Sequence, residues 1–274
     1  MKEFKVDAHE PSYLPSGGEW KLAWAEEFDG AEVDRDKWDY RLCMMGKRHP
    51  AWTDKGVQLD GESHAVFTLM LEDGRPVSSQ LQTGCNFMDE PTVPTKFGGE
   101  YLQWNIGKLK ESKFTKKYGY FECRCRLQQK EGWWTAFWLQ SPIIGASLDP
   151  QDTGSEVDIM ESFHPGNIIG HTVFTGGYGQ DSKRFHRTGK MLDETVFHRF
   201  GVLWDETGYT FYIDGEETGK ITDAVSGHPE FILITTEVKG YRNEDHQPEK
   251  EAFDAVGDTF LVDYVRVFDR TDIK

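Results

Sequence analysis

Short runs of alternating apolar and polar residues, separated by turn signals, recur along the whole chain, and long helical periodicity is absent. One turn signal is Asp73-Gly74, which lies between two strand-like runs and is typical of a two-residue β-hairpin. A second hairpin is predicted in FHRFGVLWDETGYTFYIDGEE, where each arm has one apolar face. The pattern therefore predicts an all-β chain.

The β pattern continues to the C-terminal end. FILITTEV (Phe231 to Val238) and TFLVDYVRVF (Thr259 to Phe268) are further strand-like runs, so no second domain is indicated. Residues 1–19, with two prolines and a glycine pair, are predicted to form an N-terminal arm, and residues 20–274 a single domain. Two stacked antiparallel sheets would bury the apolar faces against each other, which favours a sandwich over a barrel.

Charge and hydropathy narrow the classes of partner. The formal net charge is −16, so a nucleic acid backbone would be repelled, and nucleic acid is not expected as a partner. No apolar run reaches the ~18 residues that a membrane helix needs. The N-terminal stretch lacks the apolar core of a signal peptide, so the chain is expected in the cytoplasm as written, or outside the cell if a leader has been removed. The sequence does not determine the oligomeric state.

The four cysteines show neither metal-ligand spacing nor the density of a disulfide scaffold. In YGYFECRCRLQ, Cys123 and Cys125 alternate with polar residues and should share one strand face with Phe121 and Leu127. They are predicted to be buried free thiols.

The stretch GSEVDIMES carries three carboxylates within six residues. In a regular strand Glu156 and Asp158 share one face, whereas Glu161 lies on the other. A β-bulge around Ile159 or Met160 would add one residue and return Glu161 to the face of its two neighbours, and bulges are favoured beside active sites. All three carboxylates are therefore predicted to project into one cleft.

Clustered carboxylates raise the pKa of at least one member, so that a protonated acid stands beside an ionised carboxylate. This is the arrangement that retaining glycosidic cleavage requires, with the working pair ~5 to 5.5 Å apart. An acidic solvent face and a calcium site are the alternatives. The preceding GWWTAFWLQ favours the first interpretation, because sugar rings stack on aromatic faces, and Trp134 and Trp138 are the candidates for the cleft.

At this point the residues resemble a known family. GSEVDIMES resembles the ExDxxE signature of glycoside hydrolase family 16, in the bulged form shared by laminarinase-like and several galactan-cleaving members. GWWTAFWLQ is similar to the family's GxWPAFWML segment, with Thr135 where proline is usual, and YGYFECRCRLQ is similar to its YGxxEARxKLP strand. EEFDG and VDYVRVF resemble the strands that open and close the family domain, so the resemblance covers roughly residues 20 to 270.

The resemblance implies a concanavalin-like β-jelly-roll of two curved antiparallel sheets with a substrate cleft on the concave face. It implies Glu156 as the nucleophile, Asp158 as the residue that orients and tunes it, and Glu161 as the acid/base. No cofactor is implied for catalysis. A structural calcium is implied on the convex side, where Asp263 matches a ligand position, with an ordinary surface aspartate as the alternative.

At two places the sequence departs from the family pattern in ways that concern the substrate. Phe174 stands where laminarinase-like members commonly place a histidine, and His171 lies nearby instead as a candidate sugar contact. ITTEVKGYR lacks the asparagine-rich pattern of that group and places Glu237 on a strand that can face the cleft. Glu237, Trp104 and Asn105 are further candidates for sugar contacts.

The expected function is a retaining endo-hydrolase that acts on a β-linked polysaccharide: a β-1,3 or mixed-linkage glucan, or a red-algal or host β-galactan. A non-catalytic carbohydrate-binding protein on the same fold is the alternative, and a calcium-stabilised interaction module ranks third. A binding protein would need the aromatics but not the pair Glu156 and Glu161. The acidic net charge disfavours a heavily sulfated polymer, because the two polyanions repel each other at long range.

Overall fold

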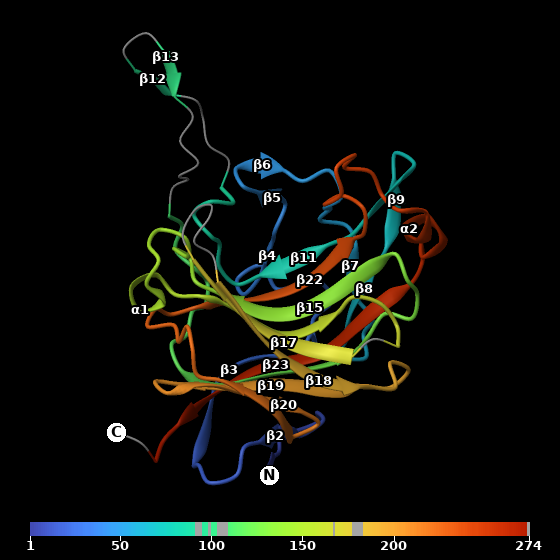
Figure 1. Cartoon of the computed structure of the whole chain (residues 1–274). Coiled ribbons are helices and arrows are strands. Elements are labelled where there is room, and N and C mark those ends of the chain that lie inside the picture. The colour runs from blue at the N-terminus through green and yellow to red at the C-terminus, as the bar shows by residue number, and fades with distance from the viewer. Residues whose placement is uncertain (91–94, 98–99, 103–108, 167, 177–182, 273–274) are drawn as a thin grey trace.

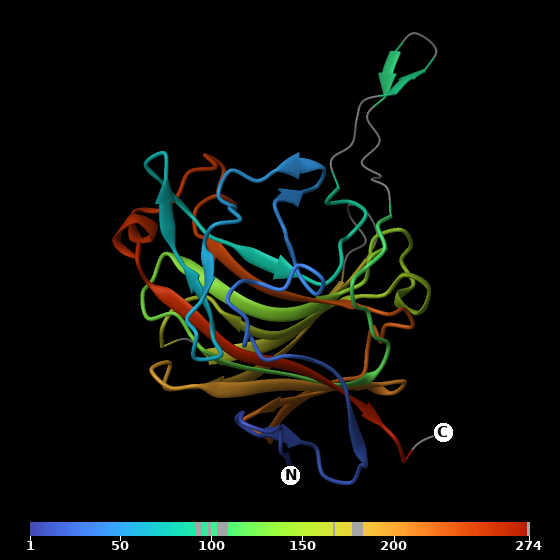
Figure 2. The same cartoon turned by 180° about the vertical axis from the view of Figure 1, so that it is seen from behind.

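The computed structural model describes residues 1–90, 95–97, 100–102, 109–166, 168–176 and 183–272. Regular structure in these residues is almost entirely strand, arranged as two large antiparallel sheets that face each other (Figure 1). The view from behind shows the same two layers, with the N-terminus below the lower one (Figure 2). The predicted all-β sandwich of two curved sheets is confirmed.

The first sheet has seven strands, in the spatial order β18 (Lys183–Met191), β17 (Ile168–Thr175), β16 (Glu156–Ser162), β15 (Trp133–Gln140), β22 (Phe231–Val238), β11 (Gln80–Gln82) and β4 (Asp39–Tyr40). The second has eight strands, in the order β21 (Glu216–Ile221), β20 (Gly208–Ile213), β19 (His198–Asp205), β14 (Gly119–Arg126), β23 (Thr259–Arg270), β8 (Ala65–Thr68) and β7 (Val57–Leu59), with β3 (Trp20–Glu26) also paired to β23.

The remaining elements are short. Four two-stranded pairs are β1 (Lys2–Phe4) with β2 (Ser12–Leu14), β5 (Cys43–Met44) with β6 (Lys47–Arg48), β9 (Met70–Glu72) with β10 (Arg75–Val77), and β12 (Thr95–Phe97) with β13 (Glu100–Leu102). The two helices are α1 (Pro150–Thr153) and α2 (Lys250–Asp254). Among the described residues, no helix is both long enough and apolar enough to span a membrane.

Both predicted hairpins are present. β9 and β10 pair across Asp73 and Gly74, whose φ angles of 49° and 77° are the positive values that a type I′ turn requires. β19 and β20 pair with Phe200 opposite Ile213 and Val202 opposite Phe211, and these side chains are fully buried. The turn residues and the two-residue side-chain period therefore determine these two hairpins, as expected.

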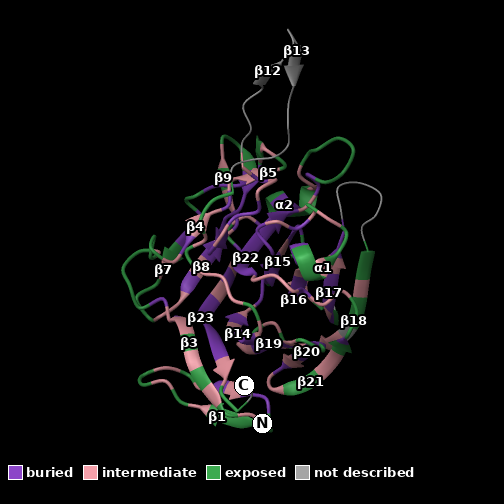
Figure 3. Cartoon of the chain, turned by 90° about the vertical axis from the view of Figure 1, so that its left-hand side faces the viewer, coloured by how far each residue is buried: buried purple, intermediate pink, exposed green. Residues whose placement is uncertain are grey.

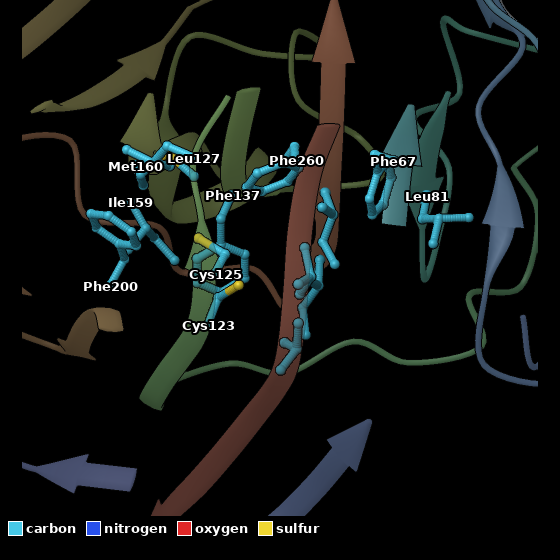
Figure 4. Packing of buried hydrophobic residues seen from close by; sticks show 14 of the residues in the cluster. Phe67, Leu81, Cys123, Cys125, Leu127, Phe137, Ile159, Met160, Phe200 and Phe260 are labelled. Carbon is cyan, nitrogen blue, oxygen red and sulfur yellow. The ribbon is translucent and has the colours of Figure 1, made fainter. Parts of the chain in front are cut away.

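The hydrophobic core fills the space between the two sheets. Figure 3 shows buried residues concentrated on the facing strands and exposed residues on the outer loops and edges. Figure 4 shows Cys123 and Cys125 of β14 packed among these core side chains. Both are free thiols with no exposed surface, as predicted.

The N-terminal arm lies against the outer face of the eight-stranded sheet. The backbone oxygens of Glu10 and Pro11 accept hydrogen bonds from Arg266 (2.8 Å) and from the Tyr264 hydroxyl (3.1 Å), both on β23. Leu14 packs in a small apolar cluster with residues of β14 and β23. The division of the chain into an arm of residues 1–19 and one unit of residues 20–274 stays a prediction.

Candidate active site

The carboxylate strand β16 contains a bulge. In its pairing with β15, Phe137 lies opposite Met160 and Trp138 lies opposite Asp158, so Ile159 is an extra residue. Ile159 and Met160 consequently both point into the core (Figure 4). Glu161 then returns to the face that carries Asp158, which confirms the predicted bulge.

His171 holds the bulge from the core side. Its Nδ1 lies 2.8 Å from the backbone oxygen of Ile159, its Nε2 lies 2.7 Å from the Thr218 hydroxyl, and its ring stacks on Phe211 at 4.5 Å. Since the carbonyl can only accept, Nδ1 carries the proton and Nε2 accepts from Thr218. Burial lowers the pKa of His171 to about 4, so the ring is neutral.

The prediction that His171 contacts sugar is therefore wrong. Its neighbour Thr172 pairs with Asp158 and shares the cleft face, so the alternation of the strand turns His171 toward the other sheet. The imidazole has no exposed surface. The sequence contained no direct signal for this, because the side on which His171 lies depends on the register of β16 and β17.

The three carboxylates line one cleft of about 350 Å³ on the outer face of the seven-stranded sheet. The strands β15, β16 and β22 form its floor, and loops after β4 and β11 form one wall. The residues that line it are Arg41, Met44, Met45, Asn86, Met88, Asp89, Trp134, Ala136, Trp138, Gln140, Glu156, Asp158, Glu161, Arg184, Thr235, Glu237 and Arg242.

Burial and mutual repulsion shift the titration of all three carboxylates. Burial, followed by repulsion from Glu156, raises the pKa of Glu161 from 4.5 to about 7. Burial, followed by repulsion from Glu161 and Glu156, raises the pKa of Asp158 well above its usual range. Burial also raises the pKa of Glu156, but Arg41 and a hydrogen bond from Gln140 oppose that shift. The cluster can therefore hold protons at neutral pH beside an ionised Glu156.

The hydrogen bond to Glu156 comes from the adjacent strand. Gln140 of β15 lies opposite Glu156 in the sheet, and its Nε2 donates to Oε2 of the carboxylate at 2.9 Å. The Gln140 Oε1 is buried and has no hydrogen-bond partner among the described residues. Gln140 thus orients one carboxylate oxygen and keeps an acceptor at the edge of the cleft.

Both tryptophans proposed for the cleft lie there. The half-buried Trp134 lies 5.2 Å from the Arg242 guanidinium, and Trp138 donates from Nε1 to the Thr235 hydroxyl at 2.9 Å. The neighbouring Trp133 is in the core with no exposed surface. The tryptophan segment therefore serves the cleft and the core from alternate positions.

Two ion pairs flank the carboxylates. Arg41 and Asp89 are both buried and lie 2.7 Å apart, and Arg41 also lies 5.4 Å from the Trp138 ring. Glu237, a predicted cleft residue, does line the cleft and pairs with Arg242 at 2.7 Å. Sequence reasoning missed Arg41, Asp89 and Arg242, because single charged residues in or beside loops carry no local pattern.

The β17–β18 side of the cleft supplies Arg184, a further group that the sequence did not reveal. Arg184 and His186 lie on the cleft face of β18, opposite Phe174 and Thr172 respectively. The imidazole of His186 covers Gly170, where an added Cβ would meet the ring at 2.5 Å. A side chain at position 170 would displace the exposed His186 ring from this place.

Trp104 and Asn105, two of the predicted sugar contacts, lie outside the described residues. Asp263 is the extra residue of a bulge in β23 and pairs with the Arg124 guanidinium. A guanidinium against the carboxylate does not suit a calcium ion, so the residues around Asp263 do not fit the implied site. Within the described ranges, the one cluster of three potential metal ligands is Asp60, Glu62 and His64.

Comparison with known proteins agrees with this site. Residues 50–242 match the family model described as glycosyl hydrolases family 16. The chain is 24% identical over 269 residues to glucan endo-1,3-beta-glucosidase A1 of Niallia circulans, covering 90% of this chain and 37% of that protein. It is 25% identical over 219 residues to beta-porphyranase D of Zobellia galactanivorans, covering 75% of this chain and 45% of that protein. The chain thus spans less than half the length of these two relatives.

Solved structures share the fold. The laminarinase of Rhodothermus marinus superposes with a TM-score of 0.65 at 21% sequence identity, covering 93% of this chain and 99% of that one. At this identity the match concerns the fold, namely the sandwich of two curved sheets.

Proposed function

The chain belongs to glycosyl hydrolase family 16, and we propose that it is an endo-acting hydrolase of a β-linked polysaccharide that works with retention through a covalent glycosyl-enzyme. The observation that carries the proposal is the bulge at Ile159, which brings Glu156, Asp158 and Glu161 onto one cleft face. Family 16 enzymes need no cofactor for this chemistry.

In the first step Glu156 attacks the anomeric carbon and the glycosidic bond breaks. Glu161 gives its proton to the departing oxygen, for which a pKa of about 7 is well suited at neutral pH. The cations Arg41, Arg242 and Arg184 and the Gln140 amide favour the ionised form of Glu156. The product of the step is a glycosyl ester on Glu156.

In the second step Glu161, now ionised, takes a proton from water, and the resulting nucleophile attacks the same anomeric carbon. The ester bond to Glu156 breaks, and two inversions leave the original configuration. Asp158 lies between the two glutamates with its pKa raised, so it retains a proton that it can share with either neighbour. This supports the role proposed for Asp158 in orienting and tuning the nucleophile.

Substrate choice lies between β-1,3 or mixed-linkage glucans and β-galactans. The two relatives described above are named for activities on one polymer of each kind. The half-buried Trp134 offers aromatic surface on which either kind of sugar ring can stack, whereas Trp138 lines the cleft but is only 7% exposed. Loops on the rigid sandwich select the linkage.

Product analysis tests the proposal. Wild type and Glu156→Ala are incubated with laminarin, mixed-linkage β-glucan, agarose, porphyran and carrageenan, and the released oligosaccharides are resolved together with their anomeric configuration. Cleavage of one polymer by wild type alone, with β products formed first, supports the proposal. Retention of a polymer by both proteins without any cleavage favours the carbohydrate-binding alternative.

A further inference from the structure

Three arginines line the cleft, and two of them are each paired with a carboxylate. Arg41 pairs with Asp89 and Arg242 pairs with Glu237, both at 2.7 Å. Arg184 differs because it is exposed and, within the described part of the chain, makes no hydrogen bond and no ion pair. Its guanidinium is therefore available to a ligand.

The position of Arg184 is set by the sheet. It lies on β18 opposite Phe174 of β17, which in turn lies opposite Glu156 of β16, and all three share the cleft face. Two strand spacings separate the backbones of Arg184 and Glu156 by roughly 10 Å. The ring of Phe174 is partly exposed between them and offers apolar surface to a sugar ring.

We propose that Arg184 binds an anionic substituent, a sulfate ester or a carboxylate, on a sugar residue next to the cleavage point. This inference rests on the proposed function and narrows its substrate to an acidic polysaccharide. A guanidinium presents paired N–H donors that match two oxygens of such a group, and these charge-assisted bonds are stronger than those to a neutral hydroxyl. A neutral sugar would not supply that charge.

The net charge of −16 argues in the other direction at long range. At physiological ionic strength, however, exposed charges are screened beyond ~8 Å, so the overall charge mainly affects the encounter. Once the polymer is bound, the local contact with Arg184 determines which substituent is retained. The net charge of the chain disfavours an anionic polymer, but the local contact with Arg184 favours one within this cleft.

A binding assay with matched polymers tests the inference. Glu156→Gln keeps the size of the side chain at position 156 and prevents cleavage. Retention of this variant is measured by affinity electrophoresis in gels that contain laminarin, sulfated laminarin or laminarin oxidised to the carboxylate at C6. Agarose and porphyran form a second neutral and sulfated pair. We expect retention by one anionic form to exceed that by its neutral parent by about tenfold, and the preferred form distinguishes sulfate from carboxylate.

Substitutions assign the preference to the guanidinium. Arg184→Ala in the Glu156→Gln background should abolish the preference, and Arg184→Lys should keep part of it. Arg187→Ala is the matched control, because it removes the same charge from the same strand, but its guanidinium donates to the backbone oxygens of Lys220 and His186. This control should keep the full preference.

Kinetics distinguish binding from an electrostatic effect on the carboxylates. In otherwise wild-type enzyme, Arg184→Ala should raise KM for the preferred anionic polymer about tenfold and should not raise KM for its neutral parent. An effect through the carboxylates alone would shift the pH profile of kcat for neutral and anionic substrates alike.

The inference is overturned if neutral and anionic forms are retained equally, if no anionic form is retained, or if the preference survives Arg184→Ala. Cleavage is scored separately. If wild type cuts a neutral polymer but shows no preference for anionic forms, this inference is wrong and the proposed function is unaffected. If Glu156→Gln cuts as well as wild type, the proposed function is wrong instead.

Discussion

The buried carboxylate of Glu122 and the carboxylate cluster of the cleft lie on opposite outer faces of the sandwich. Glu122 of β14 has no exposed surface and lies beneath the N-terminal arm, where it accepts hydrogen bonds from the Tyr13 backbone (3.0 Å), the Tyr120 hydroxyl (3.3 Å) and the Tyr264 hydroxyl (2.8 Å). Burial raises the pKa of Glu122, and the hydrogen bonds from its neighbours oppose the shift.

Asp158 of the cleft is also buried, Glu156 and Glu161 are partly buried, and the pKa values of all three are also raised. Asp158 and Glu161, however, have no side-chain hydrogen bond within the described ranges, and they face an open cleft. Burial and a raised pKa are therefore common to a structural carboxylate and a candidate catalytic one. Free carboxylate oxygens and access to the cleft are what distinguish them.

The largest effect is expected at the proposed nucleophile. Glu156→Ala should lower polysaccharide cleavage by roughly 10⁴-fold or more, because no other group can form the covalent intermediate. The melting temperature should stay within about 4 °C of wild type. Azide should restore cleavage of an activated substrate and yield a product of inverted configuration, detected by NMR. Near-normal cleavage of the polymer by the variant would refute the assignment.

A somewhat smaller loss is expected at Glu161. Glu161→Ala should lower polymer cleavage by about 10²- to 10⁴-fold, the usual contribution of a general acid. The glycosylation step on an aryl glycoside with a good leaving group should be largely spared, since that leaving group needs no proton. The measurement is the burst of released phenol in pre-steady-state kinetics. An equal loss on both substrates would contradict the role of proton donor.

The structural carboxylate should show the opposite behaviour. Glu122→Leu should cost about 3 kcal/mol of unfolding free energy, because it removes the acceptor of three hydrogen bonds, from the Tyr13 backbone and from the Tyr120 and Tyr264 hydroxyls. Activity per folded molecule should not change, since the residue lies on the far sheet. Urea denaturation measures the loss, and Glu122→Gln, which keeps an acceptor, is the control that should lose less. A loss of activity in folded Glu122→Leu would break the comparison.

The smallest effect concerns pH and stability. The pKa of Glu161 is raised from 4.5 to about 7 on folding, so its contribution to stability is fully present below pH 4.5 and is lost as the pH rises through 7. Glu161→Gln removes this loss. The variant should match wild type at pH 4 and exceed it by roughly 2 kcal/mol at pH 8, measured by urea denaturation at both values. The same difference at both pH values would show that burial of the charge is not its cause.

Much of the fold could be predicted because its signals are local. The Asp73-Gly74 turn, the two-residue period of β19 and β20 and the strand FILITTEV each depend on neighbours in sequence. The bulge in β16 was predictable for a related reason, since only an extra residue can bring Glu161 to the face of Asp158. These inferences need no knowledge of which strands become partners.

His171 shows where such reasoning ends. Its side of the sheet follows from the pairing of β16 with β17, and its role follows from a bulge carbonyl that exists only once both strands are paired. Asp263 gives a similar lesson, because its carboxylate is paired with Arg124 from another strand.

The amino-acid sequence alone determined the strand class, the main hairpin turns and the grouping of the three carboxylates, because side-chain alternation and turn geometry act over a few residues. Tertiary structure decided which charges are neutralised. Arg41 forms an ion pair with Asp89 and Arg242 forms one with Glu237, whereas Arg184 forms none with the described residues. Ion pairing depends on the distance between atoms in space. Arg41 and Asp89, which are 48 residues apart in the chain, reach that distance only when the sheets have formed.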